Sequence, residues 1–149
     1  MRAVAQRVRS ATVTVGDEIV GRTGPGVLAY VGAMKGDSPA DIDYIANKLA
    51  HLRIFRDSEG KMSSSVLDIR GGLLLVPQFT LFGDVRRGRR PSFDDAEAPE
   101  MARVLFDDLV AAVRALGAPV QTGRFREEML VEAAVVGPIT ILLDSRKVF

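Results

Sequence analysis

The chain has 149 residues, which corresponds to one domain and is long enough to bury a core without disulfides or a structural metal. Hydrophobic residues make up 47% and charged residues 26%, a globular composition that excludes collagen-like, disordered and coiled-coil structures. With 0 Cys and 1 His, the sequence also excludes disulfide scaffolds, zinc-thiolate sites and cysteine-histidine nucleophiles. Its 20 basic and 19 acidic residues leave a net charge of +1, so nucleic-acid binding would need a local basic patch.

No apolar run approaches the roughly 20 residues that span a bilayer. The first residues also lack the hydrophobic block of a signal peptide. We therefore expect a cytoplasmic protein with no membrane contact.

The first half of the chain predicts strands around one helix. Valines spaced through residues 4–15 predict two short strands that meet near residues 10–11. After Gly24-Pro25-Gly26, the apolar run 27–31 is typical of a central strand buried on both faces. Ser38 and Pro39 are a typical N-cap and first helical residue, and they predict a helix over residues 39–52. His51 lies opposite the apolar stripe of that helix and should face solvent.

The second half repeats the alternation. Residues 73–76 predict a second buried strand, which Pro77 ends, and residues 82–99 have the weak periodicity of a long functional loop. Two final strands, at residues 130–136 and 139–143, are joined by Gly137-Pro138. A second helix is predicted between the loop at residues 82–99 and these final strands, and it ends at Gly117. It is indicated by an apolar stripe of Met101, Leu105, Leu109, Ala112 and Leu116.

This order predicts one α/β domain over residues 1–149, with a mixed sheet that carries two main helices. The apolar strands outnumber the helices that could cover them. We therefore expect a second sheet layer or a partner subunit to shield the remaining face.

Side-chain catalysis has few resources in this sequence. With His51 remote, a serine or threonine nucleophile lacks its base. Backbone N–H groups at strand ends could instead stabilise an oxyanion, and residues 77–81 and 136–140 are the two segments that fit that role. From the residues alone, Thr80 could equally be an ordinary strand residue and Gly137-Pro138 an ordinary turn.

The most basic segment is residues 86–90, which hold four arginines. It is either a solvated charged loop or a patch that contacts phosphates, because guanidinium groups match phosphate oxygens. Phe93 and Phe125 are close in sequence to arginines and could stack on bases. The patch could be extended by Arg53, Arg56, Arg124 and Arg126.

Several short motifs are spread along the whole chain: Gln6-Arg7-Val8, Leu52-Arg53-Ile54-Phe55, Gly60-Lys61-Met62, Gln78-Phe79-Thr80-Leu81, Gly88-Arg89-Arg90-Pro91-Ser92-Phe93, Thr122-Gly123-Arg124-Phe125 and Gly137-Pro138-Ile139-Thr140. Together they resemble the D-aminoacyl-tRNA deacylases, also called the D-tyrosyl-tRNA deacylase family. The resemblance implies a hydrolase that cleaves the ester of D-aminoacyl-tRNA, or of glycyl-tRNA, to free tRNA and amino acid. It also implies a homodimer of three-layer α/β/β domains, with the active site at the subunit interface and no metal or organic cofactor.

The resemblance also implies how chirality is checked. Gly137-Pro138 would be a cis pair inserted into the partner's site, where its carbonyls hold the α-ammonium and leave no space for an L side chain. Such contacts around Cα tolerate every D side chain, and they cannot exclude glycine, which has no Cβ to clash. By the same resemblance, Arg7 braces this pair and Met129 lines the pocket.

Further roles follow from the resemblance. The main-chain N–H groups of Gln78, Phe79 and Thr80 would face the scissile carbonyl. Water assisted by the 2′-hydroxyl of the terminal ribose would attack, rather than Thr80. Candidate tRNA contacts are Arg89, Arg90 and Arg124, with Phe125 as a stacking residue.

The sequence departs from the family pattern at Ser63, Pro77, Leu130 and Val135. Pro77 resembles a related animal deacylase with a relaxed chiral check, which edits L-alanine from tRNA. Arg7 and Phe79 favour the D-specific form. Two alternatives therefore stand beside it: a relaxed-chirality deacylase of L-alanyl-tRNA, and a non-catalytic nucleic-acid-binding module.

Overall fold

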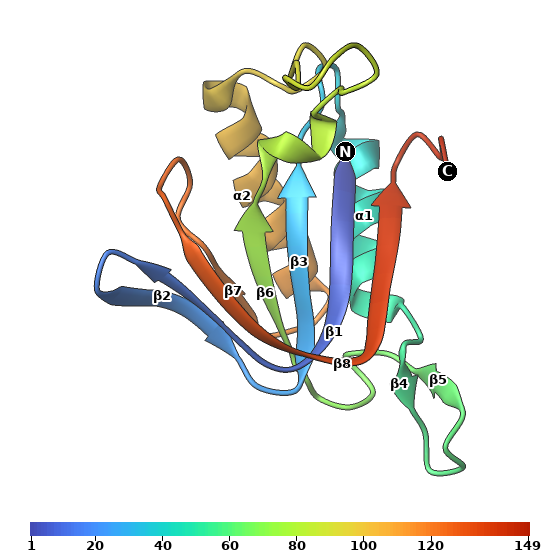
Figure 1. The fold of residues 1–149 in the computed structure, drawn as a ribbon. Helices are drawn as coiled ribbons and strands as arrows, with labels where there is room; N and C mark the ends of the chain where they lie inside the picture. Colours follow the sequence, from blue (N-terminus) through green and yellow to red (C-terminus); the bar gives the residue numbers. More distant parts are fainter.

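Two long antiparallel strands, β1 (Arg2–Val15) and β8 (Leu130–Asp144), form the spine of the sheet. The computed structural model describes residues 1–149. The first half of β1 pairs antiparallel with β3 (Gly26–Gly32), and its second half pairs antiparallel with β2 (Glu18–Thr23). From β3 the sheet continues in parallel through β6 (Gly72–Pro77) to β7 (Val120–Thr122) (Figure 1). The sheet is therefore mixed, as the order of elements predicts.

Both long helices, α1 (Pro39–His51) and α2 (Pro99–Ala115), lie behind the same face of this sheet in Figure 1. Ser38 and Asp41 form a capping box at the start of α1, and Pro39 occupies the first turn. Between the helices and the sheet lies the main core of 24 buried residues. The short hairpin of β4 (Phe55–Arg56) and β5 (Met62–Ser64) projects from the body.

The other face of the sheet has a smaller core. There, β2 curls toward β7, so the sheet is nearly barrel-like. The backbone N–H of Arg22 donates to Oε1 of Gln121 at 2.8 Å, and a Cβ atom placed on Gly21 would lie 2.5 Å from the carbonyl oxygen of Thr122. Only glycine allows this close approach. This core consists of Val8, Ala11, Val13, Leu28, Leu74 and Val76.

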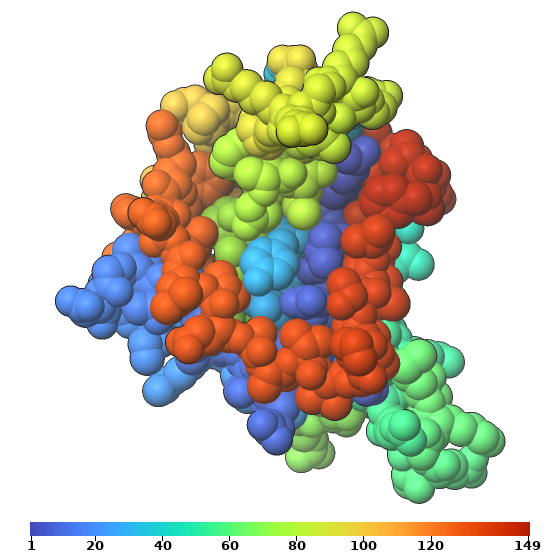
Figure 2. Space-filling view, viewed as in Figure 1, coloured from blue at the N-terminus to red at the C-terminus, as the bar shows by residue number.

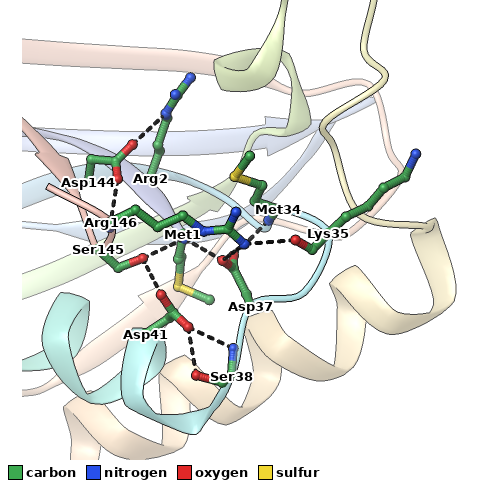
Figure 3. Close-up of polar contacts among 10 residues, drawn as sticks. All are labelled: Met1, Arg2, Met34, Lys35, Asp37, Ser38, Asp41, Asp144, Ser145 and Arg146. Carbon is green, nitrogen blue, oxygen red and sulfur yellow. Dashed lines mark hydrogen bonds and ion pairs between the residues drawn. The ribbon is translucent and has the colours of Figure 1, made fainter. Parts of the chain in front are cut away.

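A polar cluster ties the start of β1 to the end of β8 and to α1 (Figure 3). The amino group of Met1 donates to Oδ1 of Asp37 and to Oγ of Ser145, both at 2.7 Å. Ser145 in turn donates to Asp41 at 2.6 Å. Burial acts to raise the pKa of Asp41, but hydrogen bonds from Ser145 and Ser38 and the nearby ammonium group lower it to about 2.

The α/β class, the mixed sheet and the two helices are confirmed, whereas two predicted strand breaks are wrong. The expected break near residues 10–11 is absent, because β1 passes through it as one strand. Register shifts between Gln6 and Ser10 bend β1 without ending its pairing with β8. The two strands predicted around Gly137-Pro138 are likewise one element, β8.

The predicted stripe of the second helix is also partly wrong. Met101 is 51% exposed. Figure 1 shows that the first turns of α2 extend beyond the ends of the strands, and no residue of α2 before Leu105 is buried. The buried face of α2 consists of Leu105, Phe106, Leu109, Val110 and Val113.

Candidate functional site

A pocket of about 780 Å³ opens at the carboxyl ends of the parallel strands β3 and β6. This edge of an α/β sheet is a common place for ligands, because the chain leaves each strand there for a loop. Figure 2 shows the surface hollowed between the green end of β6 and the orange start of β8, with light-blue β3 beneath. The pocket is mostly apolar, and its lining includes Val31, Gly32, Val76, Pro77, Gln78 and Phe79.

A tight turn at the end of β6 forms one rim of the pocket. The N–H of Gln78 donates to the carbonyl of Val31 at 2.7 Å, which attaches the turn to β3. The short 3-10 helix η1 (Phe79–Phe82) follows at once. Because the first amides of a helix have no partner within it, the N–H groups of Phe79 and Thr80 donate to no backbone or side-chain acceptor. Two adjacent backbone donors are therefore free in this turn, and the first of them belongs to Phe79, which lines the pocket.

Aromatic side chains frame the same opening. Phe79 is 57% exposed and meets Phe93 edge to face, with 4.9 Å between ring centroids. Phe93, Phe125 and Met129 also line the pocket. The pocket lining thus brings together six residues that were singled out from the sequence: Gln78, Phe79, Phe93, Phe125, Arg126 and Met129.

Thr80 does not line the pocket, and its side chain has no activating base. Its hydroxyl oxygen accepts a hydrogen bond from Nε2 of Gln78. The one histidine, His51, is exposed as predicted and lies at the end of α1, where Nδ1 contacts the carbonyl of Asn47 at 3.0 Å. Proton abstraction from Thr80 by a neighbouring side chain is therefore not built into this turn.

Gly137-Pro138 lies outside this pocket, on an exposed part of β8. The peptide bond between the two residues is cis. Arg7 holds the segment from β1: its Nε donates to the carbonyl of Val136 at 3.2 Å, and its Nη1 donates to the carbonyl of Ile54 at 2.7 Å. Arg7 therefore joins this part of β8 to the base of the β4–β5 hairpin.

The basic residues fall into two groups. Arg89 and Arg90 are exposed in the loop above the pocket and take part in none of the ion pairs of the chain. Arg124 is paired with Glu18 at 3.0 Å. Arg86 is paired with Asp84, and its guanidinium hydrogen bonds lower the pKa of that partly exposed carboxyl to about 2. Arg89 and Arg90 are thus free for a partner, whereas Arg124 is partly neutralised.

No group of three or more histidine, cysteine or acidic side chains is arranged to hold a metal ion. Neither long helix has the combination of length and apolar character that a transmembrane helix needs.

One wall of the pocket comes from the end of the loop and the first turns of α2. The sequence predicted a functional loop over residues 82–99 but did not single out these residues, because most of them are small and apolar and carry no recognisable chemistry. The helical spacing of Phe106 was the one available signal. These lining residues are Ala96, Glu97, Ala98, Pro99, Ala102 and Phe106.

Fold and site together define an α/β protein with a mostly apolar pocket at its strand ends, with free backbone amides in the turn after β6 and with Arg126 in its lining. Residues 4–144 match the family model of D-Tyr-tRNA(Tyr) deacylase. The D-aminoacyl-tRNA deacylase of Sorangium cellulosum (strain So ce56) is 54% identical over 100% of both chains. The D-aminoacyl-tRNA deacylase of Symbiobacterium thermophilum is 53% identical over 100% of this chain and 99% of its own.

A solved structure described as the c-Myc DNA unwinding element binding protein superposes with a TM-score of 0.92. It is 35% identical and covers 97% of this chain and 98% of its own. The chain belongs to the D-Tyr-tRNA(Tyr) deacylase family.

Proposed function

We propose that the protein hydrolyses the ester that joins a D-amino acid, or glycine, to the 3′ end of tRNA, as a chiral proofreading step in translation. The observation that carries this proposal is the free N–H of Phe79, a residue that lines the pocket, followed directly along the chain by the free N–H of Thr80. Two adjacent backbone donors can bind the oxyanion that forms when an ester carbonyl is attacked. Membership of the deacylase family supports the choice of substrate.

In the proposed reaction, water attacks the ester carbonyl carbon and the 3′ oxygen of the terminal ribose leaves with a proton. The products are free tRNA and the free amino acid. The adjacent 2′-hydroxyl of the ribose assists the proton transfer, because the turn at Gln78 offers no side-chain base. Thr80 contributes its N–H and not its hydroxyl. No metal or organic cofactor takes part.

Chiral selection needs a rigid group near Cα of the substrate, and we propose that the partner subunit of a homodimer supplies it. The cis Gly137-Pro138 pair is exposed, lies outside its own pocket and is held by Arg7. In the proposed dimer of three-layer α/β/β domains, it enters the partner's pocket and its carbonyls accept hydrogen bonds from the α-ammonium. Exposed apolar side chains along β8, Leu130 and Leu142 among them, support an interface there.

We propose that Arg89 and Arg90 contact the tRNA phosphates, with Arg124 at the edge of the same surface. Their exposure and lack of acidic partners support this role for the first two. Phe125 lines the pocket and can stack on a nucleotide base. We propose a cytoplasmic location, which is consistent with a tRNA substrate.

A deacylation assay with purified protein tests the proposal. We expect D-Tyr-tRNA and Gly-tRNA to be hydrolysed and L-Tyr-tRNA to be spared. Hydrolysis of L-Ala-tRNA at a similar rate would instead establish the relaxed-chirality enzyme. Binding of tRNA without hydrolysis of any ester would refute the enzyme and favour a nucleic-acid-binding module.

A further inference from the structure

Gly123 lies directly behind the pocket wall, where neighbouring atoms leave no room for a side chain. Gly123 is buried, and its N–H donates to the carbonyl of Leu75 at 2.8 Å, so its backbone is fixed beside β6. A Cβ atom placed on Gly123 would lie 2.7 Å from Sδ of Met129. It would also lie 3.5 Å from Cδ of Pro77 and 3.6 Å from Cγ1 of Val76, which are ordinary contact distances.

The backbone of Gly123 does not itself require glycine. Its φ angle lies outside the left-handed region, unlike those of Gly117 and Gly137. Alanine could therefore adopt the same conformation, and only the thioether of Met129 stands in its way. Because that atom is near the end of a flexible side chain, the side chain and not the backbone would move.

We propose that Gly123 is a positioning residue, which lets the Met129 side chain lie against the β6 wall and so sets the width of the pocket. Met129, Pro77 and Val76 all line the pocket. Met129 also packs against the smaller core, which limits its movement on that side. A methyl group at position 123 therefore drives the thioether toward the open volume, where the substrate would bind. This inference rests on the proposed deacylase function.

The contrast with Gly32 shows why Gly123 acts through one side chain. A Cβ atom on Gly32 would lie 2.8 Å from the carbonyl oxygen of Gln78 and 3.0 Å from the ring of Phe82. Alanine at position 32 would therefore displace backbone in the turn itself. At position 123 the collision is with Met129 alone, so the two effects can be separated by experiment.

The test compares G123A, M129A, the double variant G123A/M129A and the control G24A. A Cβ atom on Gly24 meets nothing within 4 Å, and its φ angle is not left-handed, so G24A measures the general effect of the change. For G123A we expect the KM for D-Tyr-tRNA to rise about tenfold with kcat changed less than threefold, because a narrowed pocket weakens binding. For the double variant we expect a KM no higher than that of M129A.

The KM readout separates positioning from a general loss of folded protein, which lowers apparent kcat and leaves KM unchanged. A second readout does not depend on activity: the methyl signal of Met129 in protein labelled with 13C-methyl methionine. It should shift in G123A and not in G24A, and its loss in M129A assigns it.

The inference is overturned if G123A leaves both KM and the Met129 signal unchanged. It is also overturned if the increase in KM caused by G123A is multiplied in full by that of M129A in the double variant. If G123A does not fold, the double variant decides: folding rescued by removal of the Met129 side chain supports the contact, and failure of both overturns it. If wild-type protein hydrolyses no aminoacyl-tRNA, the proposed function fails, and the methyl signal still decides whether Gly123 positions Met129.

Discussion

Replacement of Arg7 by alanine removes two hydrogen bonds that hold Gly137-Pro138 in place. The guanidinium of Arg7 donates to the carbonyls of Val136 and Ile54. Charge-assisted bonds of this kind stabilise by roughly 1.5–3 kcal/mol each, and about 1 kcal/mol each is appropriate for a half-buried group that water reaches. We therefore expect R7A to destabilise this part of β8 by about 2 kcal/mol.

In the proposed dimer, Gly137-Pro138 acts in the partner's pocket only when β8 is held in place. A destabilisation of β8 by about 2 kcal/mol then corresponds to roughly a 30-fold loss in kcat/KM for D-Tyr-tRNA. R7K should lose less, because an ammonium group can serve one carbonyl but lacks the rigid fork that reaches two. R9A is the matched control: Arg9 is exposed on the same strand and makes none of the side-chain hydrogen bonds or ion pairs found in the chain. Deacylation kinetics and urea unfolding check these values. Wild-type kcat/KM in R7A would refute the reasoning.

Four further substitutions test other parts of the mechanism and the fold. T80A should keep kcat within about tenfold of wild type, because the N–H of the turn remains; a loss of several orders of magnitude in folded T80A would indicate a hydroxyl nucleophile. Since the folded-state pKa of Asp41 is about 2 against an ordinary 3.8, its stabilisation is present above pH 3.8 and is lost as the pH falls toward 2. Thermal unfolding of D41N should therefore depend less on pH across that interval, and an unchanged pH dependence would contradict the assignment. R89A and R90A should each weaken tRNA binding and reduce the slope of log affinity against log salt by about one; an unchanged slope would remove that residue from the interface.

The helices were the most predictable part of the fold, because their signals are local. Ser38 and Pro39 mark the start of α1 within neighbouring residues, and the structure places both as expected. The continuity of β1 through residues 10–11 depends instead on pairing with β8, whose residues lie more than 100 positions away. A turn signal and a bent strand have similar local composition, so only the partner strand distinguishes them.

The site residues likewise divide into those that local sequence could predict and those that depend on distant contacts. Gln78 and Phe79 could be proposed because they follow a buried strand directly, where the chain must turn out of the sheet. The pocket wall at the start of α2 could not be proposed from the sequence, because its alanine and proline residues line a pocket only through the position of their helix. The ion pair of Arg124 with Glu18 joins residues 106 positions apart, and it changes which arginines are free for a phosphate.

The arrangement of the two functional segments gives the strongest reason to expect subunit sharing. The free amides at Phe79 and Thr80 can stabilise an oxyanion, but nothing on that rim distinguishes the two hands of Cα. We propose that the carbonyls of Gly137-Pro138 serve that purpose, and this pair lies outside the pocket of its own chain. A D-specific hydrolase needs both functions at one carbon atom. In the proposed dimer they meet because a second copy brings its β8 to the first copy's pocket. We therefore expect chiral selectivity to be lost when the dimer is dissociated, while any residual ester hydrolysis should no longer distinguish D from L.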